Sequence, residues 1–167
     1  DKEASYAASV MATLNKYARD QVADLQVHAC TDITGFGLAG HALEMAKGSD
    51  RSLEVSLSSL PLMEGALDYA SMGFIPAGAY RNREFAGEEC GFLWRSCAGE
   101  SPSGMDEEEL AAREDIVFDP QTSGGLLICV APQDAAKAME RLSSLSLPSA
   151  IIGRVTDLQK KHLVFVK

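Results

Sequence analysis

The 167-residue sequence lacks several features that would assign it to a special class of protein. No apolar run approaches the roughly 20 residues that a membrane-spanning helix needs, and the N-terminus lacks the basic-then-apolar layout of a signal peptide. No internal repeat and no linker rich in proline or serine divides the chain. Because 46% of the residues are apolar and 23% are charged, we expect one compact domain that is cytoplasmic and has no membrane partner.

Positive charge is also scarce. The sequence has 15 Lys and Arg against 24 Asp and Glu, a formal net charge of −9. Nonspecific binding of nucleic acid depends on Lys and Arg that displace counterions from phosphates, so we predict no nucleic acid partner. Much of the acidity lies in residues 88–89 and 105–109. Adjacent carboxylates on a helix do not face one another, which favours a solvated helix face over a metal site in both runs.

The sequence shows no obvious nucleophile and no zinc-binding pattern. The cysteines are far apart, without zinc-knuckle spacing, and are expected to be reduced: Cys30, Cys90, Cys97 and Cys129. For His28 and His41 a polar packing role is favoured over metal binding, and His162 is expected at the surface. No Ser-His-Asp or Cys-His pair can be assigned, so we assign no catalytic residue to this chain.

Apolar periodicity and turn residues predict helices and strands along the whole sequence. Helices are expected over residues 4–17, 37–47 (with Gly48 closing this helix), 61–73, the acidic run at 105–109, and from Pro132 onward. Strands are expected over residues 27–30, 53–57, 126–130, 151–155 and 163–166, and residues 74–104 are expected to hold loops and one short helix. Because the chain ends in strand after strand, the pattern favours an α+β sandwich over a doubly wound sheet.

The first motif of chemical interest places Asp32 just before a glycine-rich turn that opens a helix. A carboxylate there could bind Mg²⁺, and a helix N-terminus favours a bound phosphate. The alternative is that Asp32 caps the helix or forms an Asx-turn, which stabilises the chain by roughly 1 kcal/mol and does no chemistry. From the residues alone, the cap is slightly favoured.

The same motif contains the spacing G-x-G-x-x-G at Gly35, Gly37 and Gly40. In a dinucleotide-binding fold an acidic residue should follow about 20 positions later, at the end of a strand. Glu54 lies inside a predicted strand, and no further strand-helix repeat follows. We therefore reject a dinucleotide site and expect these glycines to allow close packing of the helix on a strand.

A second motif, residues 115–125, runs directly into the predicted strand at 126–130. Its turn, Thr122 to Gly125, could hold a phosphate with backbone N–H groups and two hydroxyls. However, it leads into a strand and has no Lys after the glycines, which excludes a P-loop. A β-bulge or a sharp turn into the strand is equally possible.

Together, these motifs resemble the selenophosphate synthetase family, also called selenide, water dikinase. Residues 29–41, with Glu44-Met45 following, look like one family signature, and residues 119–127 look like the second. Residues 80–83 and 151–155 also resemble the family, in the right order and spacing, so the resemblance covers nearly the whole chain.

The resemblance implies a C-terminal domain of the aminoimidazole ribonucleotide synthetase type, a layered α/β sandwich with a mixed sheet covered by helices. Residues 1–167 would be a single C-terminal domain of a larger enzyme and inactive alone. In that family the N-terminal domain, absent here, carries a glycine-rich segment, a reactive Cys or selenocysteine, a Lys and most of the ATP contacts. None of those motifs occurs in this sequence, and no cysteine here matches their context.

The family reaction converts ATP, selenide and water into selenophosphate, AMP and phosphate, with Mg²⁺ as cofactor. The resemblance implies that Asp32 is a metal ligand, supported by Thr31, Thr34 and Gly35 at the magnesium-phosphate site. The implied partners are the N-terminal domain, ATP, selenide and a second copy in a full-length homodimer, and we expect an exposed apolar patch where the N-terminal domain docks. The alternatives are a domain of another ATP-using member of the superfamily or a stand-alone binding module without catalytic activity.

Overall fold

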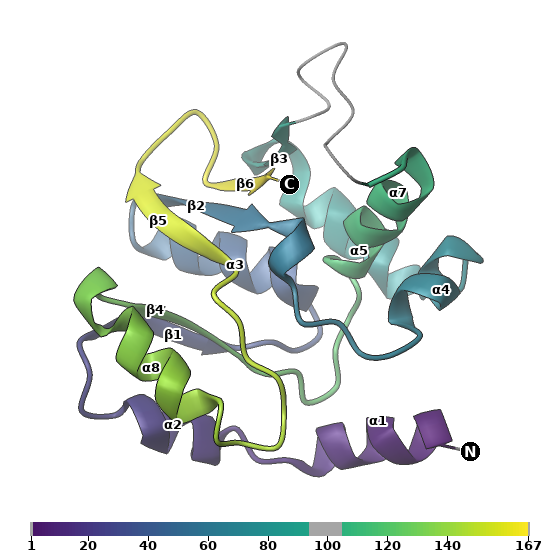
Figure 1. Ribbon diagram of the computed structural model, residues 1–167. Helices are drawn as coiled ribbons and strands as arrows, with labels where there is room; N and C mark the ends of the chain where they lie inside the picture. The colour runs from purple at the N-terminus through teal and green to yellow at the C-terminus, as the bar shows by residue number, and fades with distance from the viewer. Residues whose placement is uncertain (1, 94–104, 167) are drawn as a thin grey trace.

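The computed structural model describes residues 2–93 and 105–166, which form two β-sheets with helices packed around them (Figure 1). The first sheet is antiparallel and contains β1 (Val27–Asp32) and β4 (Leu126–Val130). The second has the strand order β3-β6-β2-β5, formed by Cys90–Phe92, Leu163–Val166, Arg51–Ser56 and Gly153–Asp157. Since β6 runs parallel to β2 and β3 while β5 is antiparallel to β2, this sheet is mixed, and the expected α+β class is confirmed.

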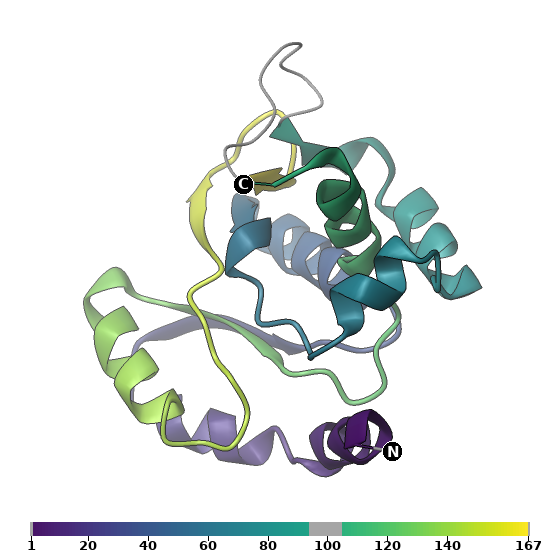
Figure 2. The ribbon, with the colours of Figure 1, turned by 45° about the vertical axis from the view of Figure 1, so that its right-hand side comes forward.

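One helix connects the two sheets. The α-helices are α1 (Lys2–Ala12), α2 (Lys16–Val22), α3 (Gly37–Gly48), α4 (Ala66–Ser71), α5 (Ala77–Ala86), α7 (Glu107–Ile116) and α8 (Ala135–Leu142). Helix α3 contacts β1 in the first sheet and both β2 and β6 in the second. Helices α2 and α8 pack together on the side of the first sheet that faces away from the second (Figures 1 and 2). Within the described residues, no helix is long and apolar enough to cross a bilayer.

The core lies where α3 meets the four-stranded sheet. The buried face of α3 carries apolar residues at helical spacing, mostly alanines: Ala39, Ala42, Leu43 and Ala46. They pack with larger buried side chains of the strands and of the second motif, Leu53, Val55, Leu163, Phe165, Val117 and Phe118. Small residues on the helix let its backbone approach both sheets closely, so this packing fixes the position of the loop before α3.

The N-terminal segment forms two helices instead of the single predicted one. The helix breaks at residues 13–15, where Thr13 donates its hydroxyl proton to the Ser9 carbonyl and Asn15 donates to the Gly124 carbonyl at 3.1 Å. Such side chains compete with helical hydrogen bonding. No residue of α1 is buried, so its apolar periodicity does not correspond to a core face.

Three predicted helix ends are wrong. Gly48 is the last residue of α3 and does not close it, because the left-handed position after this helix is occupied by Asp50 (φ 51°). Pro61 does not start a helix; α4 begins at Ala66, after Gly65 adopts φ 82°. Pro132 begins a short 3₁₀ turn, and α8 follows only at Ala135.

The segment expected to hold loops and one short helix contains more regular structure. It holds the ten-residue helix α5 and the edge strand β3, which pairs with β6. The part of that expectation at residues 94–104 lies outside the described residues.

Two other predicted elements are found close to their expected places. Strand β5 spans Gly153–Asp157, two residues later than predicted, because it pairs in register with β2. The acidic run forms the start of α7 as expected, with Asp106 as its N-cap.

Candidate functional site

Asp32 is the last residue of β1, where it pairs with Leu126 of β4. Its side chain is exposed, and no hydrogen bond or ion pair joins the carboxylate to any other residue in 2–93 or 105–166. The N-cap of α3 is Phe36, and no side chain caps that helix. The capping and Asx-turn alternatives for Asp32 are therefore wrong, and its carboxylate is available to a ligand.

The exposed face of β1 presents His28, Cys30 and Asp32 at alternate positions. Burial, with a smaller contribution from the Asp32 charge, raises the pKa of the Cys30 thiol, which favours the unreactive thiol over the thiolate. No group of three or more His, Cys, Asp or Glu side chains in the described residues could hold a metal ion by itself. Asp32 is thus a single exposed carboxylate and not part of a complete metal site within the described chain.

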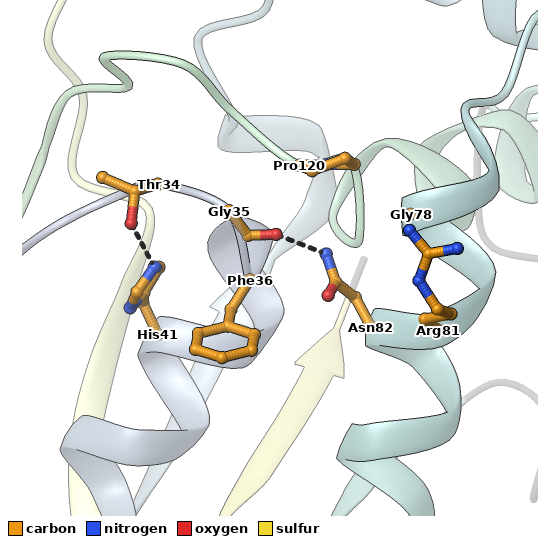
Figure 3. Close-up of a pocket in the computed structure, with 8 residues that line it drawn as sticks. All are labelled: Thr34, Gly35, Phe36, His41, Gly78, Arg81, Asn82 and Pro120. Atoms are coloured by element: carbon orange, nitrogen blue, oxygen red, sulfur yellow. Dashed lines mark hydrogen bonds between the residues drawn. The ribbon is translucent and has the colours of Figure 1, made fainter.

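The three predicted supporting residues separate into two environments. Thr31 donates its hydroxyl proton to the Asp32 carbonyl at 3.2 Å. Thr34 and Gly35 instead line a hollow of about 470 Å³, together with Phe36, His41, Gly78, Arg81, Asn82 and Pro120 (Figure 3). Thr31 and Asp32 are not among the residues lining it. The hollow therefore begins two residues beyond the Asp32 carboxylate along the chain.

The two sequence motifs, far apart in the chain, form one loop cluster. The Ile33 N–H donates to the Gly125 carbonyl at 2.9 Å, and the Gln121 N–H donates to the Thr34 carbonyl at 3.0 Å. A Cβ at Gly37 would lie 2.8 Å from the Asp119 carbonyl oxygen, and Gly37 has φ 70°. Gly37 is therefore required by close packing against the second motif, as expected, and not by the binding of a dinucleotide.

The turn of the second motif is a sharp turn into β4. Ser123 adopts φ 59°, and a Cβ at Gly124 would overlap the Ile33 carbonyl oxygen. Gly124 therefore allows the second motif to lie directly against the segment that follows Asp32. This geometry supports the structural interpretation of the turn.

Asn82 is a site residue that the sequence analysis did not assign. It is buried in α5, and its side-chain amide donates to the carbonyls of Gly35 and Phe118, each at 2.9 Å (Figure 3 shows the first of these bonds). A buried asparagine that joins both motifs holds their relative position. The available signal was the resemblance of residues 80–83 to the family, but the segment was expected to be mostly loop.

Asp119 is a half-buried carboxylate in the second motif. Burial raises its pKa, and a hydrogen bond from the Gln121 side chain at 2.5 Å opposes that rise. The carboxylate is therefore held where its charged form is disfavoured.

Of the two histidines expected to pack, His28 is exposed on β1 and no side-chain hydrogen bond or ion pair is found for it among the described residues. His41 contacts the Thr34 hydroxyl at 3.0 Å and donates from Nδ1 to the Glu44 carboxylate at 3.1 Å, so its polar packing role is confirmed. His162 is partly exposed and contacts Glu89 at 2.8 Å. The described cysteines, Cys30, Cys90 and Cys129, are free thiols, and Cys97 lies outside the described residues.

Comparison with known proteins identifies the class. Residues 7–166 match the family model of the AIR synthase related protein, C-terminal domain, and the chain belongs to this family. A crystal structure of tt0281 from Thermus thermophilus has the same fold, with a TM-score of 0.53 and 18% identity over 89% of this chain and 34% of that one. The expected architecture is therefore confirmed.

Within this family, the chain is similar to proteins named selenide, water dikinase. It is 41% identical over 156 residues to that of Clostridium botulinum (strain Eklund 17B / Type B) and 44% identical over 159 residues to that of Treponema denticola. It is 43% identical over 159 residues to selenide, water dikinase 2 of Peptoclostridium acidaminophilum. These matches cover 92–94% of this chain but only 41–42% of each relative. The resemblance predicted from the two motifs is confirmed.

Proposed function

We propose that this chain acts as the C-terminal domain of a selenide, water dikinase, which converts ATP, selenide and water into selenophosphate, AMP and phosphate. In this proposal an N-terminal domain supplies the nucleophile and most of the ATP contacts, and the full-length protein forms a homodimer. The chain by itself is inactive. The proposal rests on the similarity to named relatives, of which the chain spans about two fifths.

The observation that carries the role of Asp32 is its free, exposed carboxylate at the end of β1. Mg²⁺ prefers hard oxygen ligands and commonly binds through one or two carboxylates, waters and substrate phosphates. A single unpaired carboxylate fits such a site as one ligand, and the remaining ligands would come from ATP and the N-terminal domain. The Mg²⁺ ion would neutralise phosphate charge as the triphosphate is cleaved.

Thr31, Thr34 and Gly35 have supporting roles in this proposal. The Thr31 hydroxyl bonds to the Asp32 carbonyl and so stabilises the backbone that carries the carboxylate. The Gly35 carbonyl is held by Asn82, while its N–H has no acceptor among the described residues and is available to a phosphate oxygen. Thr34 anchors the first motif to the second through its carbonyl.

The test replaces Asp32 with Asn in a full-length protein containing this chain. Removing the charge should lower ATP-dependent selenide consumption on the order of 100-fold or more, because the metal loses an anionic ligand. The melting temperature should barely change, since the carboxylate contacts no other described residue and exposed substitutions of this kind cost about 0.5 kcal/mol or less.

Asp157→Asn is the matched control, because Asp157 is also an exposed aspartate at the end of a strand, β5. It should leave activity unchanged. Retained activity in Asp32→Asn would overturn the proposed metal role. Selenide consumption by the 167-residue chain alone would contradict the expected dependence on an N-terminal domain.

A further inference from the structure

The hollow beside the first motif is lined by three separate segments. Residues 34–36 form one wall, α5 forms a second with Gly78, Arg81 and Asn82, and Pro120 completes it (Figure 3). A Cβ at Gly78 would lie 2.8 Å from the Pro120 side chain, so α5 approaches the second motif closely. Together with the two hydrogen bonds of Asn82, this packing preforms the hollow. Its volume of about 470 Å³ is within the usual range for small-molecule sites, roughly 300–1,000 Å³.

The charge of the hollow is opposite to that of the protein. The chain carries a formal charge of −9, yet no Asp or Glu lines the hollow and Arg81 supplies a positive charge. Within residues 2–93 and 105–166, no hydrogen bond or ion pair joins the Arg81 guanidinium to another residue. Other arginines of this part do contact carboxylates: Arg19, Arg83, Arg113, Arg141 and Arg154. An unpaired guanidinium therefore faces a preformed hollow in an acidic protein.

The rest of the lining is uncharged, and its polar side chains already bond to other groups of the protein. The Thr34 hydroxyl contacts His41 at 3.0 Å, which places a hydroxyl and an imidazole on the wall next to the loop (Figure 3). Phe36 covers another side and stacks on Phe85, with 5.4 Å between the ring centroids, so that wall is apolar. Guanidinium groups bind phosphate and carboxylate oxygens in a bidentate way, and an apolar wall lowers local screening.

We propose that this hollow binds a phosphate-type oxyanion through Arg81. The phosphate class, as opposed to the carboxylate class, rests on the proposed function, in which phosphoryl groups of ATP are transferred and phosphate is released. Arg81 would hold the oxyanion, and Asn82 would fix the backbone around it. Asp32 does not line the hollow, but Thr34 and Gly35 do, so the hollow adjoins the proposed magnesium site.

The experiment follows amide chemical shifts of the 167-residue chain during titration with inorganic phosphate at constant ionic strength. We expect saturable shifts at residues 34–36 and 78–82. Arg81→Gln should weaken binding about tenfold or more, because it removes a charge-assisted contact. Arg81→Lys should weaken it less, since the charge remains but the bidentate geometry is lost. Arg51 is an exposed arginine outside the hollow, and among the described residues its guanidinium bonds only to the Asp50 carbonyl, so Arg51→Gln should bind as the parent does.

Separate titrations with tripolyphosphate and acetate distinguish the source of the anion. Tighter binding of tripolyphosphate would assign the hollow to the phosphate chain of a nucleotide, and tighter binding of inorganic phosphate would assign it to the released product. Equal affinity for acetate, or equal affinity of Arg81→Gln and the parent, would overturn the proposal. Because this assay needs no turnover, its failure is distinguishable from failure of the proposed function, which the Asp32→Asn activity assay tests.

Discussion

At the scale of single residues, burial destabilises the charged carboxylate of Asp119, and the fold itself does not require a charge at this position. The carboxylate is half-buried, and its contact with the Gln121 amide does not fully offset the loss of hydration that raises its pKa. An asparagine could accept the same hydrogen bond without a charge. Charged groups held in unfavourable surroundings are concentrated at functional sites, so Asp119 is the second acidic residue of this loop cluster to test for a role in activity.

Asp119→Asn is expected to stabilise the chain at neutral pH, with a rise in melting temperature on the order of 1–2 °C. Because the pKa is raised in the folded state, the stability that depends on this carboxyl is present below its unfolded pKa and is lost as the pH rises through the folded pKa. The difference between the variant and the parent should therefore disappear in acid. Melting curves from about pH 3 to about pH 7 measure this difference. A variant that is less stable than the parent at neutral pH would contradict the claim that burial disfavours the charged form of Asp119.

At the scale of elements, the contact between the two motifs depends on glycine at particular positions. Gly37 and Gly124 lie against carbonyl groups of the opposite motif, whereas nothing lies within 4 Å of a Cβ at Gly35 or Gly125. Close packing therefore requires glycine at some positions of the two motifs but not at others.

Gly124→Ala should destabilise the chain by roughly 2–4 kcal/mol, because the added methyl group overlaps the Ile33 carbonyl and pushes the second motif away from the first. Gly125→Ala is the matched control and should change the free energy of unfolding by about 0.5 kcal/mol or less. Urea denaturation measures both. Equal losses in the two variants would show that the close approach at Gly124 does not decide stability.

Elements that depend on local pattern were predicted well. Helix α3 and the strands β4 and β6 were found at or within one residue of their expected bounds, because their apolar residues pack in the core or against it. The helix expected from Pro61 failed because Gly65 turns the chain with φ 82° before α4 can begin. Strand β3 was missed because three residues carry too little pattern, and only pairing with β6 defines them.

At the scale of the whole molecule, the two sheets differ in how well they are supported. Strands β2 and β6 lie inside a four-stranded sheet with residues such as Leu53, Val55 and Phe165 buried. Within residues 2–93 and 105–166, β1 and β4 form a sheet of two strands, and β1 exposes alternate side chains. A two-stranded sheet is marginal unless other elements cover it, and here α3 and the pair α2 and α8 do so.

Hydrogen exchange should therefore be slower in β2 and β6 than in β1 and β4. We expect the protection of their paired amides to differ about tenfold or more, because the smaller sheet can open locally while the larger core stays folded. Amide exchange followed by NMR measures this difference in protection. Repeating the measurement at a second pH value tests whether the opening reaction is at equilibrium. Equal protection would indicate that both sheets open in a single cooperative unit.

Near the hollow, Phe36 and Phe85 are 45% and 57% exposed and stack on each other, which makes them candidates for the expected apolar docking surface. Its role in docking an N-terminal domain stays a prediction. The sequence located these residues in a motif and in a predicted loop, but their stacking depends on how α5 packs against α3.

The α+β class, the family and the position of Asp32 before a glycine-rich turn all follow from the sequence alone, because motifs and local periodicity are properties of neighbouring residues. That Asp32 ends a strand and does not cap a helix follows only from the folded chain, since it depends on pairing with β4. The same is true of Asn82, which joins the two motifs, and of Arg81, which faces a hollow. The contacts of Asn82 join segments 36 or more residues apart, and the packing of α3 and α5 brings them together.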